Sequence, residues 1–147
     1  MKAPHWIETG RGERVLVFLH GISGGAAGAL DILPLLTPPG WRGLAWDMPG
    51  YGKSRQVEPV NFDSFAGALV DLFDAAGLEQ AVLVGHSMGG MIALQAAVRF
   101  PERISGLVLA CCTPAFGAPA GPLQQAFLAR RLGPLDRELD DAQHRAP

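Results

Sequence analysis

The chain has 147 residues, which is enough for one domain with its own hydrophobic core. Hydrophobic residues make up 48% of the sequence and charged residues 18%, which excludes a mostly disordered protein. The formal net charge of −2 gives no electrostatic reason to expect nucleic acid or an anionic membrane as a partner. Because no segment approaches the roughly 20 apolar residues that span a bilayer, and the N-terminus lacks a signal-peptide pattern, we expect a cytoplasmic protein.

Short apolar segments bounded by glycine or proline predict four β-strands, at residues 14–20, 43–47, 81–85 and 104–112. The first and third segments lack polar alternation, which is typical of strands buried on both faces in the middle of a parallel sheet. A further strand is expected at residues 5–9, joined to the strand at 14–20 as a hairpin through Gly10-Arg11-Gly12.

Helical patterns separate these strands. Apolar residues at helical spacing predict a helix over 62–76, with Asn61 as its N-cap and Gly77 as its left-handed C-terminal residue. Residues 89–100 are apolar nearly all round and predict a buried helix, and residues 29–36 predict a weaker, short one. The alternation of strands and helices indicates an α/β fold, with a mostly parallel sheet and flanking helices.

The character of the sequence changes after the last predicted strand. An irregular stretch rich in proline and glycine leads to an amphipathic pattern at 123–132 and a charged tail at 136–145. We therefore expect residues 1–112 to form part of an α/β core, and residues 113–147 to begin a helical region that ends in the charged tail. The adjacent cysteines, Cys111 and Cys112, are interpreted as strand residues, because two thiols alone do not make a metal site.

The segment Gly85-His86-Ser87-Met88-Gly89 matches the pattern G-x-S-x-G, between a buried strand and an apolar helix. A serine on such a sharp turn holds its hydroxyl above the sheet, and the flanking Gly85 and Gly89 keep side chains out of the turn. The start of the helix also brings amides and a positive dipole end near any oxyanion. The pattern predicts Ser87 as a nucleophile; the alternative is a glycine-rich turn with an incidental serine.

A second segment, His20-Gly21-Ile22-Ser23-Gly24-Gly25, follows the first buried strand. A glycine-rich loop there can bring a main-chain N–H toward a carbonyl under attack, and a tetrahedral oxyanion needs two such donors. We expect the amides of Ile22 and Met88 to be these donors, with His20 and Gly21 supporting the loop. The alternative is a flexible turn.

The segment from Asp47 to Ser54 ends in Gly-Lys-Ser and invites comparison with a phosphate-binding loop. That motif requires glycine where this chain has Asp47, so the match fails and Asp47 is expected to be structural.

Together these segments resemble the α/β-hydrolase superfamily: His20-Gly21, Asp47-x-Pro49-Gly50-x-Gly52-x-Ser54 and Gly85-His86-Ser87-Met88-Gly89-Gly90 occur in that family's order. Phe100-Pro101-Glu102-Arg103, followed by Leu107-Val108-Leu109-Ala110, is similar to small bacterial esterases, enol-lactonases and carbon–carbon bond hydrolases. The resemblance covers residues 5–115. It implies an α/β-hydrolase-type sheet that stops before the family's last strands, with residues 113–135 entering a helical cap.

By this resemblance, Ser87 accepts the acyl group of a small-molecule ester, lactone or related substrate, and the acyl-enzyme is then hydrolysed. Ser87 stands where the family's dehalogenases and epoxide hydrolases carry aspartate, which argues against those two chemistries. No metal and no organic cofactor is implied.

The resemblance also implies an acid and a histidine after the nucleophile. His5 and His20 precede Ser87, and the side chain of the adjacent His86 is expected to point elsewhere. Only His144 follows, with Asp136, Asp140 or Asp141 as its acid, but a charged tail does not position a base within about 1 Å.

We therefore expect the chain by itself to lack its catalytic acid and base and to be inactive. The alternatives are a non-catalytic binding protein with this fold, and a split enzyme completed by a partner chain. A chain that stops here would also expose an apolar edge strand at 104–112 and self-associate through it.

Overall fold

The computed structural model describes residues 3–113, 121–122 and 125–126. By its internal contacts the chain divides into residues 1–113 and 114–147, and the fold below is that of the first unit. Apart from residues 125 and 126, the helix predicted at 123–132 and the charged tail with His144 lie outside the described residues.

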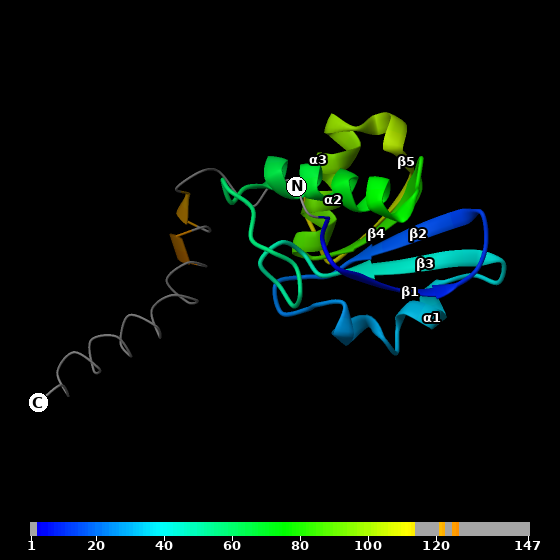
Figure 1. The fold of residues 1–147 in the computed structure, drawn as a ribbon. Helices are drawn as coiled ribbons and strands as arrows, with labels where there is room; N and C mark the ends of the chain where they lie inside the picture. The colour runs from blue at the N-terminus through cyan, green and yellow to red at the C-terminus, as the bar shows by residue number, and fades with distance from the viewer. Residues whose placement is uncertain (1–2, 114–120, 123–124, 127–147) are drawn as a thin grey trace, which may run out of the picture. The chain divides into compact units, whose positions relative to one another are not determined.

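Five strands form one sheet in the order β1-β3-β2-β4-β5 (Figure 1). β1 pairs antiparallel with β3, and the other neighbouring strands are parallel, so the predicted mostly parallel sheet is confirmed. The strands are β1 (Trp6–Gly10), β2 (Arg14–Leu19), β3 (Trp41–Trp46), β4 (Ala81–His86) and β5 (Ile104–Ala110).

The predicted hairpin between the first two strands is wrong. β1 pairs with β3 instead, and Trp6 lies opposite Trp46. The physical reason is that the uniformly apolar β2 takes a central position, where β3 occupies one of its edges and β4 the other. On the surface of the β1–β3 pair, Arg42 and Glu8 form an ion pair of 2.7 Å.

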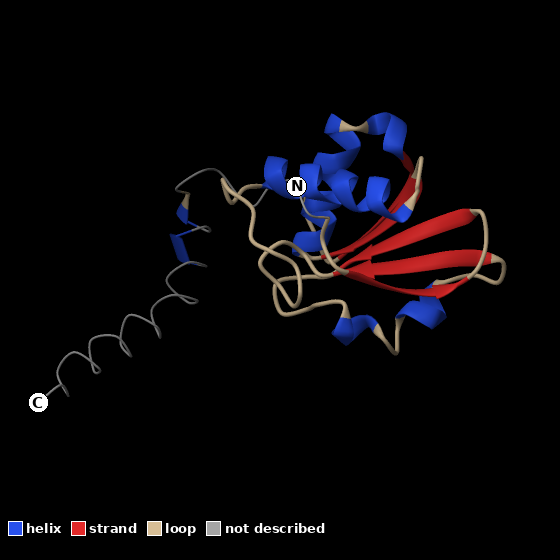
Figure 2. Cartoon of the chain, in the orientation of Figure 1, coloured by secondary structure: helices blue, strands red, loops and turns tan. Residues whose placement is uncertain are grey.

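Helices cover both faces of the sheet (Figure 2). The helices α2 (Phe62–Ala76) and α3 (Met88–Arg99) lie on one face, and α1 (Leu33–Leu36) lies on the other. Both predicted ends of α2 are confirmed: Asn61 Oδ1 accepts a hydrogen bond from the Ser64 amide at 2.8 Å, and Gly77 has φ +70°.

The single helix predicted over 29–36 is wrong, because the structure has a 3₁₀ turn at Ala27–Ala29 and then the separate helix α1. Pro34 stands in the first turn of α1, where its missing N–H is not needed. In a helix that began at residue 29, the same proline would remove a hydrogen bond to Leu30 and clash with its carbonyl group.

The main hydrophobic core lies between the sheet and the helices α2 and α3. It contains the fully buried Val17, Leu83 and Phe73, among others. A smaller core on the opposite face joins Leu16 of β2 to Leu33 of α1. Because Leu16 and Val17 enter opposite cores, β2 needs an uninterrupted apolar sequence, and its buried central position follows from that sequence.

One edge of the sheet is β5, which carries no charged residue along its seven positions. Val108 is 51% exposed and Leu109 42% exposed, so an apolar edge strand is present as predicted. The strand is two residues shorter than predicted, because Cys111 has φ +53° and turns the chain away from the sheet. In the described part of the chain, no helix is long and apolar enough to cross a membrane.

Candidate active site

Ser87 lies at the sharp turn between β4 and α3, with φ +53° and ψ −120°. This backbone conformation costs a residue other than glycine about 1–3 kcal/mol. The turn is held by two hydrogen bonds: the Ser87 amide donates to Ala110 O at 2.8 Å, and the Gly90 amide donates to Ser87 O at 2.9 Å. The Ser87 hydroxyl does not cap the helix and bonds to no side chain in the described residues, so it remains available for chemistry.

The predicted glycines around the turn are sites of close main-chain packing. A Cβ atom at Gly89 would collide with the main chain of Leu19 and His20, and one at Gly85 would lie 2.5 Å from the Cα atom of Gly90. Since main chain cannot move aside as a side chain can, both positions require glycine. The first turn of α3 therefore packs directly against the end of β2.

The glycine-rich segment after β2 reaches the same turn. A Cβ atom at Gly21 would lie 3.2 Å from both Ser87 Cβ and His86 Nδ1. In the described part of the chain, the amides of Ile22 and Met88 donate no hydrogen bond. The Met88 amide is free because the first amides of a helix have no partner within it. The structure thus brings the loop close to the turn at Ser87, and each carries one main-chain amide without a partner among the described residues.

His20 joins this loop to the segment that follows β3. The Met48 amide donates to His20 Nε2 at 3.1 Å, and His20 Nδ1 lies 2.7 Å from Gly21 O. Because an amide can only donate, Nε2 must be unprotonated. The proton is therefore on Nδ1, which donates a hydrogen bond to Gly21 O. Burial lowers the pKa of His20, although the Gly21 bond and the charge of Asp47 act in the opposite direction. Both ring nitrogens are therefore engaged in holding the loop.

Asp47 is a buried carboxylate, 5% exposed, at the end of β3. Its oxygens accept hydrogen bonds from the amides of Ala26 at 2.8 Å and Lys53 at 3.0 Å, and Oδ2 lies 2.8 Å from His5 Nδ1. Burial by itself raises the pKa of Asp47, but these hydrogen bonds outweigh it and the pKa is lowered below its ordinary value. Asp47 is therefore ionised at neutral pH, at the junction of three segments.

Sequence reasoning missed the contacts of Asp47 with Ala26 and His5. The residues are 21 and 42 positions from Asp47, and no local pattern links them. The available signal was Gly52, which has φ +50° and at which a Cβ atom would collide with the Asp47 carboxylate.

Among the described residues, no histidine is arranged as a catalytic base for Ser87. His5 is paired with Asp47, His20 uses both ring nitrogens, and the exposed His86 has no carboxylate partner there. His144 and its three candidate acids, Asp136, Asp140 and Asp141, lie outside the described residues. Within the same residues, no cluster of three or more histidine, cysteine, aspartate or glutamate side chains could hold a metal ion.

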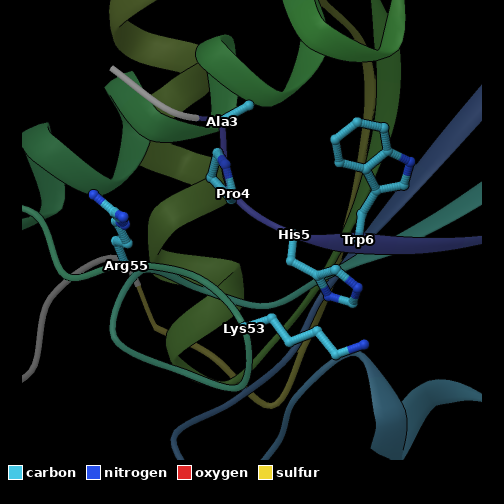
Figure 3. Close-up of a pocket in the computed structure, with 6 residues that line it drawn as sticks. All are labelled: Ala3, Pro4, His5, Trp6, Lys53 and Arg55. Atoms are coloured by element: carbon cyan, nitrogen blue, oxygen red, sulfur yellow. The ribbon is translucent and has the colours of Figure 1, made fainter.

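A surface hollow of about 450 Å³ lies beside the entry to β1 (Figure 3), lined by Ala3, Pro4, His5, Trp6, Lys53 and Arg55. The two cationic side chains, Lys53 and Arg55, extend in different directions and do not converge on one point. None of Ser87, Ile22 and Met88 lines this hollow, so it is not part of the candidate active site.

Comparison of the sequence with known protein families identifies the family to which the chain belongs. A family model described as the alpha/beta hydrolase fold matches residues 14–144. A 2-hydroxy-6-oxononadienedioate/2-hydroxy-6-oxononatrienedioate hydrolase from Paraburkholderia phymatum is 38% identical over 110 residues, which cover 71% of this chain and 38% of that protein. A pimeloyl-(acyl-carrier protein) methyl ester esterase from Serratia marcescens is 37% identical over 118 residues, covering 80% of this chain and 44% of the esterase.

Among solved structures, an esterase from a marine microorganism superimposes with a TM-score of 0.76 at 22% identity, covering 86% of this chain and 48% of the esterase. That identity supports the fold alone. The chain spans less than half the length of each of these proteins. The family model matches most of the sequence, and the chain therefore belongs to the α/β-hydrolase family.

Proposed function

We propose that the chain carries the nucleophile of a serine hydrolase, with Ser87 forming an acyl-enzyme from an ester, a lactone or a related acyl substrate. The observation that carries the proposal is the conformation of Ser87, a strained residue whose hydroxyl bonds to no described side chain. Its neighbours are the Met88 amide and Gly21 of the loop that carries Ile22, and the amides of Met88 and Ile22 have no partner among the described residues. Such strain persists where the surrounding structure imposes it, and it gathers at functional sites. The curated relatives are named as hydrolases, one of them as a methyl ester esterase, which supports the reaction class.

In the proposed reaction, Ser87 Oγ bonds to the carbonyl carbon of the substrate, and its proton passes to a base. The carbonyl oxygen becomes an oxyanion that accepts hydrogen bonds from the amides of Ile22 and Met88. The carbon–oxygen bond to the leaving alcohol then breaks, the alcohol takes up the proton, and water later hydrolyses the acyl-serine. The removal of one of the two donors is expected to raise the barrier by about 3–4 kcal/mol.

The base and the acid that orients it belong to sequence outside the described residues, or to a partner chain. In the absence of a positioned base, both acylation and hydrolysis of the acyl-serine are slow, because serine and water are weak nucleophiles at neutral pH. We expect the 147-residue chain to take up an acyl group from an activated ester and to retain it. Ile22, 59% exposed beside the turn, favours a substrate that is apolar next to its carbonyl group.

Intact-protein mass spectrometry after incubation with p-nitrophenyl butyrate tests this proposal. One butyryl group should add to the native chain, peptide mapping should locate it at Ser87, and Ser87→Ala should abolish it. Ser105→Ala, which removes an exposed hydroxyl on β5, is the matched control and should leave the adduct unchanged. An adduct that persists in Ser87→Ala, or no adduct at all, would contradict the proposal.

A second candidate is a binding protein that keeps the fold without catalysis. The observation in its favour is that no described histidine has a carboxylate partner and a position beside Ser87. A binding protein would retain butyrate esters reversibly, with no change of covalent mass. The same mass measurement, made beside an equilibrium binding titration with a non-hydrolysable butyl ketone, distinguishes the two candidates.

A further inference from the structure

The glycine-rich loop that carries Ile22 is anchored at both ends by two consecutive residues, Asp47 and Met48. At its start, the Met48 amide donates a hydrogen bond to the ring of His20, and the other ring nitrogen of His20 donates to Gly21 O. At its end, the Asp47 carboxylate accepts the amide of Ala26 at 2.8 Å. Between the two anchors the loop has one internal main-chain bond, from the Gly24 amide to Gly21 O at 3.0 Å. The position of the loop is therefore set by the segment after β3.

The Asp47 carboxylate is itself fixed from several sides. The Lys53 amide bonds Oδ2 at 3.0 Å, and His5 Nδ1 lies 2.8 Å from the same oxygen. The main chain of Asp47 is also held, since its amide donates to His5 O at 2.8 Å and Ser54 Oγ donates to Asp47 O at 2.6 Å. A buried carboxylate that accepts this number of hydrogen bonds has a fixed position, and its hydrogen bond to the Ala26 amide therefore fixes the position of Ala26 as well.

We propose that Asp47 is a positioning residue of the active site: through the Ala26 amide it fixes the loop so that the Ile22 amide faces the reacting carbonyl. The inference rests on the proposed function of Ser87 for its catalytic consequence, but the placement of the loop is a separate, measurable property. An oxyanion donor must be held within a fraction of an ångström to be effective. Asp47 supplies this precision from outside the site, without contacting the substrate.

Two variants weaken the anchor between Asp47 and the loop from opposite sides. Asp47→Asn keeps the shape but replaces one acceptor oxygen by a donor, so that one of the facing amides loses its partner. Ala26→Pro keeps Asp47 intact and removes the donor, and the native φ of −56° at Ala26 suits proline. The matched control is Asp63→Asn, the same chemical change at an exposed aspartate in α2 that pairs with Arg99.

Amide hydrogen exchange by NMR on the 147-residue chain is the readout that does not depend on activity. The Gly24 amide reports the order of the loop, because its own partner is Gly21 O and not Asp47. Both Asp47→Asn and Ala26→Pro should accelerate exchange at Gly24 by at least about tenfold, while amides in the middle of α2 and the Asp63→Asn control remain unchanged. Unchanged exchange at Gly24 in both variants would overturn the proposal.

The catalytic consequence is measured by the rate of Ser87 butyrylation. In both variants the rate at saturating ester should fall by about tenfold or more, with the half-saturating ester concentration within about twofold, because an oxyanion donor acts in the transition state. Equal losses in rate and in apparent affinity would indicate a merely structural role and contradict the proposal. If the unaltered chain is not acylated at Ser87, the proposed function fails, and exchange at Gly24 still decides whether Asp47 positions the loop.

Discussion

The main-chain amide of Ser87 donates a hydrogen bond of 2.8 Å to the carbonyl oxygen of Ala110, the last residue of β5. This hydrogen bond ties the turn at Ser87 to the neighbouring strand, which is an edge of the sheet. The chain turns at the same level in both strands, through Ser87 with φ +53° and Cys111 with φ +53°. The placement of the serine hydroxyl therefore depends on the edge strand as well as on β4 and α3.

The strain at Ser87 predicts an unusual order of stability between two variants. Ser87→Gly should be more stable than Ser87→Ala by about 1 kcal/mol, because glycine adopts positive φ without the cost of about 1–3 kcal/mol that alanine incurs. The greater freedom of glycine in the unfolded chain offsets part of this difference. Urea denaturation of both variants measures it, and an alanine variant as stable as the glycine variant would show that the turn is relaxed.

Two glycine-to-alanine changes in helices should have opposite effects. Gly89→Ala directs a methyl group into the main chain of Leu19 and His20 and should destabilise the fold by about 2 kcal/mol or more. Gly67→Ala, within α2 and with open space around its Cβ position, should stabilise it by about 0.5–1 kcal/mol. Thermal unfolding of the pair checks the packing of α3 against β2. A destabilised Gly67→Ala or a neutral Gly89→Ala would contradict the structure.

The fold should lose stability as the pH falls below the ordinary pKa of histidine. The pKa of His20 is lowered from 6.5, chiefly by burial, so the folded chain takes up this proton at a lower pH than the unfolded chain. Stability therefore declines from about pH 6.5 down to the folded-state pKa and is not affected further below it. Asp47, whose pKa is lowered from 3.8, acts in the same direction but only below about pH 4.

Urea denaturation between about pH 8 and about pH 5 measures the contribution of His20. His20→Gln keeps polar groups near Met48 and Gly21 but does not titrate, so its stability should depend less on pH than that of the unaltered chain. Identical pH dependence in the two proteins would mean that His20 is not held in the neutral form by the fold.

We propose that the chain self-associates through β5. This edge has no charged residue, whereas the other edge, β1, carries Glu8, and an unprotected edge strand is a template for pairing with a second copy. Val108→Lys should lower the average mass measured by sedimentation. Val98→Lys makes the same change at a 77% exposed position on α3 and should leave the mass unchanged. A monomeric unaltered chain, or equal effects of the two variants, would contradict the proposal.

The parts of the fold that the sequence predicted correctly are those with local signals. The apolar run at 81–85 predicted β4, and Asn61 with Gly77 predicted both ends of α2. The single helix predicted over 29–36 was wrong for a local reason as well. Pro34 starts a separate helix, and the apolar pattern alone does not indicate this. The partner of β1 could not be predicted, because strand pairing is decided by which strand takes the centre of the sheet.

The candidate site likewise has one part that local sequence predicts and another part that it does not. The turn at Ser87 was predictable because a strand, a glycine pattern and a helix follow one another along the chain. The bonds of Asp47 to Ala26 and His5 were not, because they join distant segments through single side-chain atoms. The roles of Ser87, Ile22 and Met88 in catalysis stay predictions.

Reaction of the native chain with a fluorophosphonate probe, read by peptide mapping, tests most directly whether the fold activates Ser87. We predict phosphonylation of Ser87, none at Ser23, Ser54, Ser64 or Ser105, and no reaction at any serine once urea has unfolded the chain. Labelling spread evenly over the serines, or equal labelling of Ser87 in the folded and unfolded chain, would mean that the turn between β4 and α3 confers no special reactivity, and would contradict the central claim.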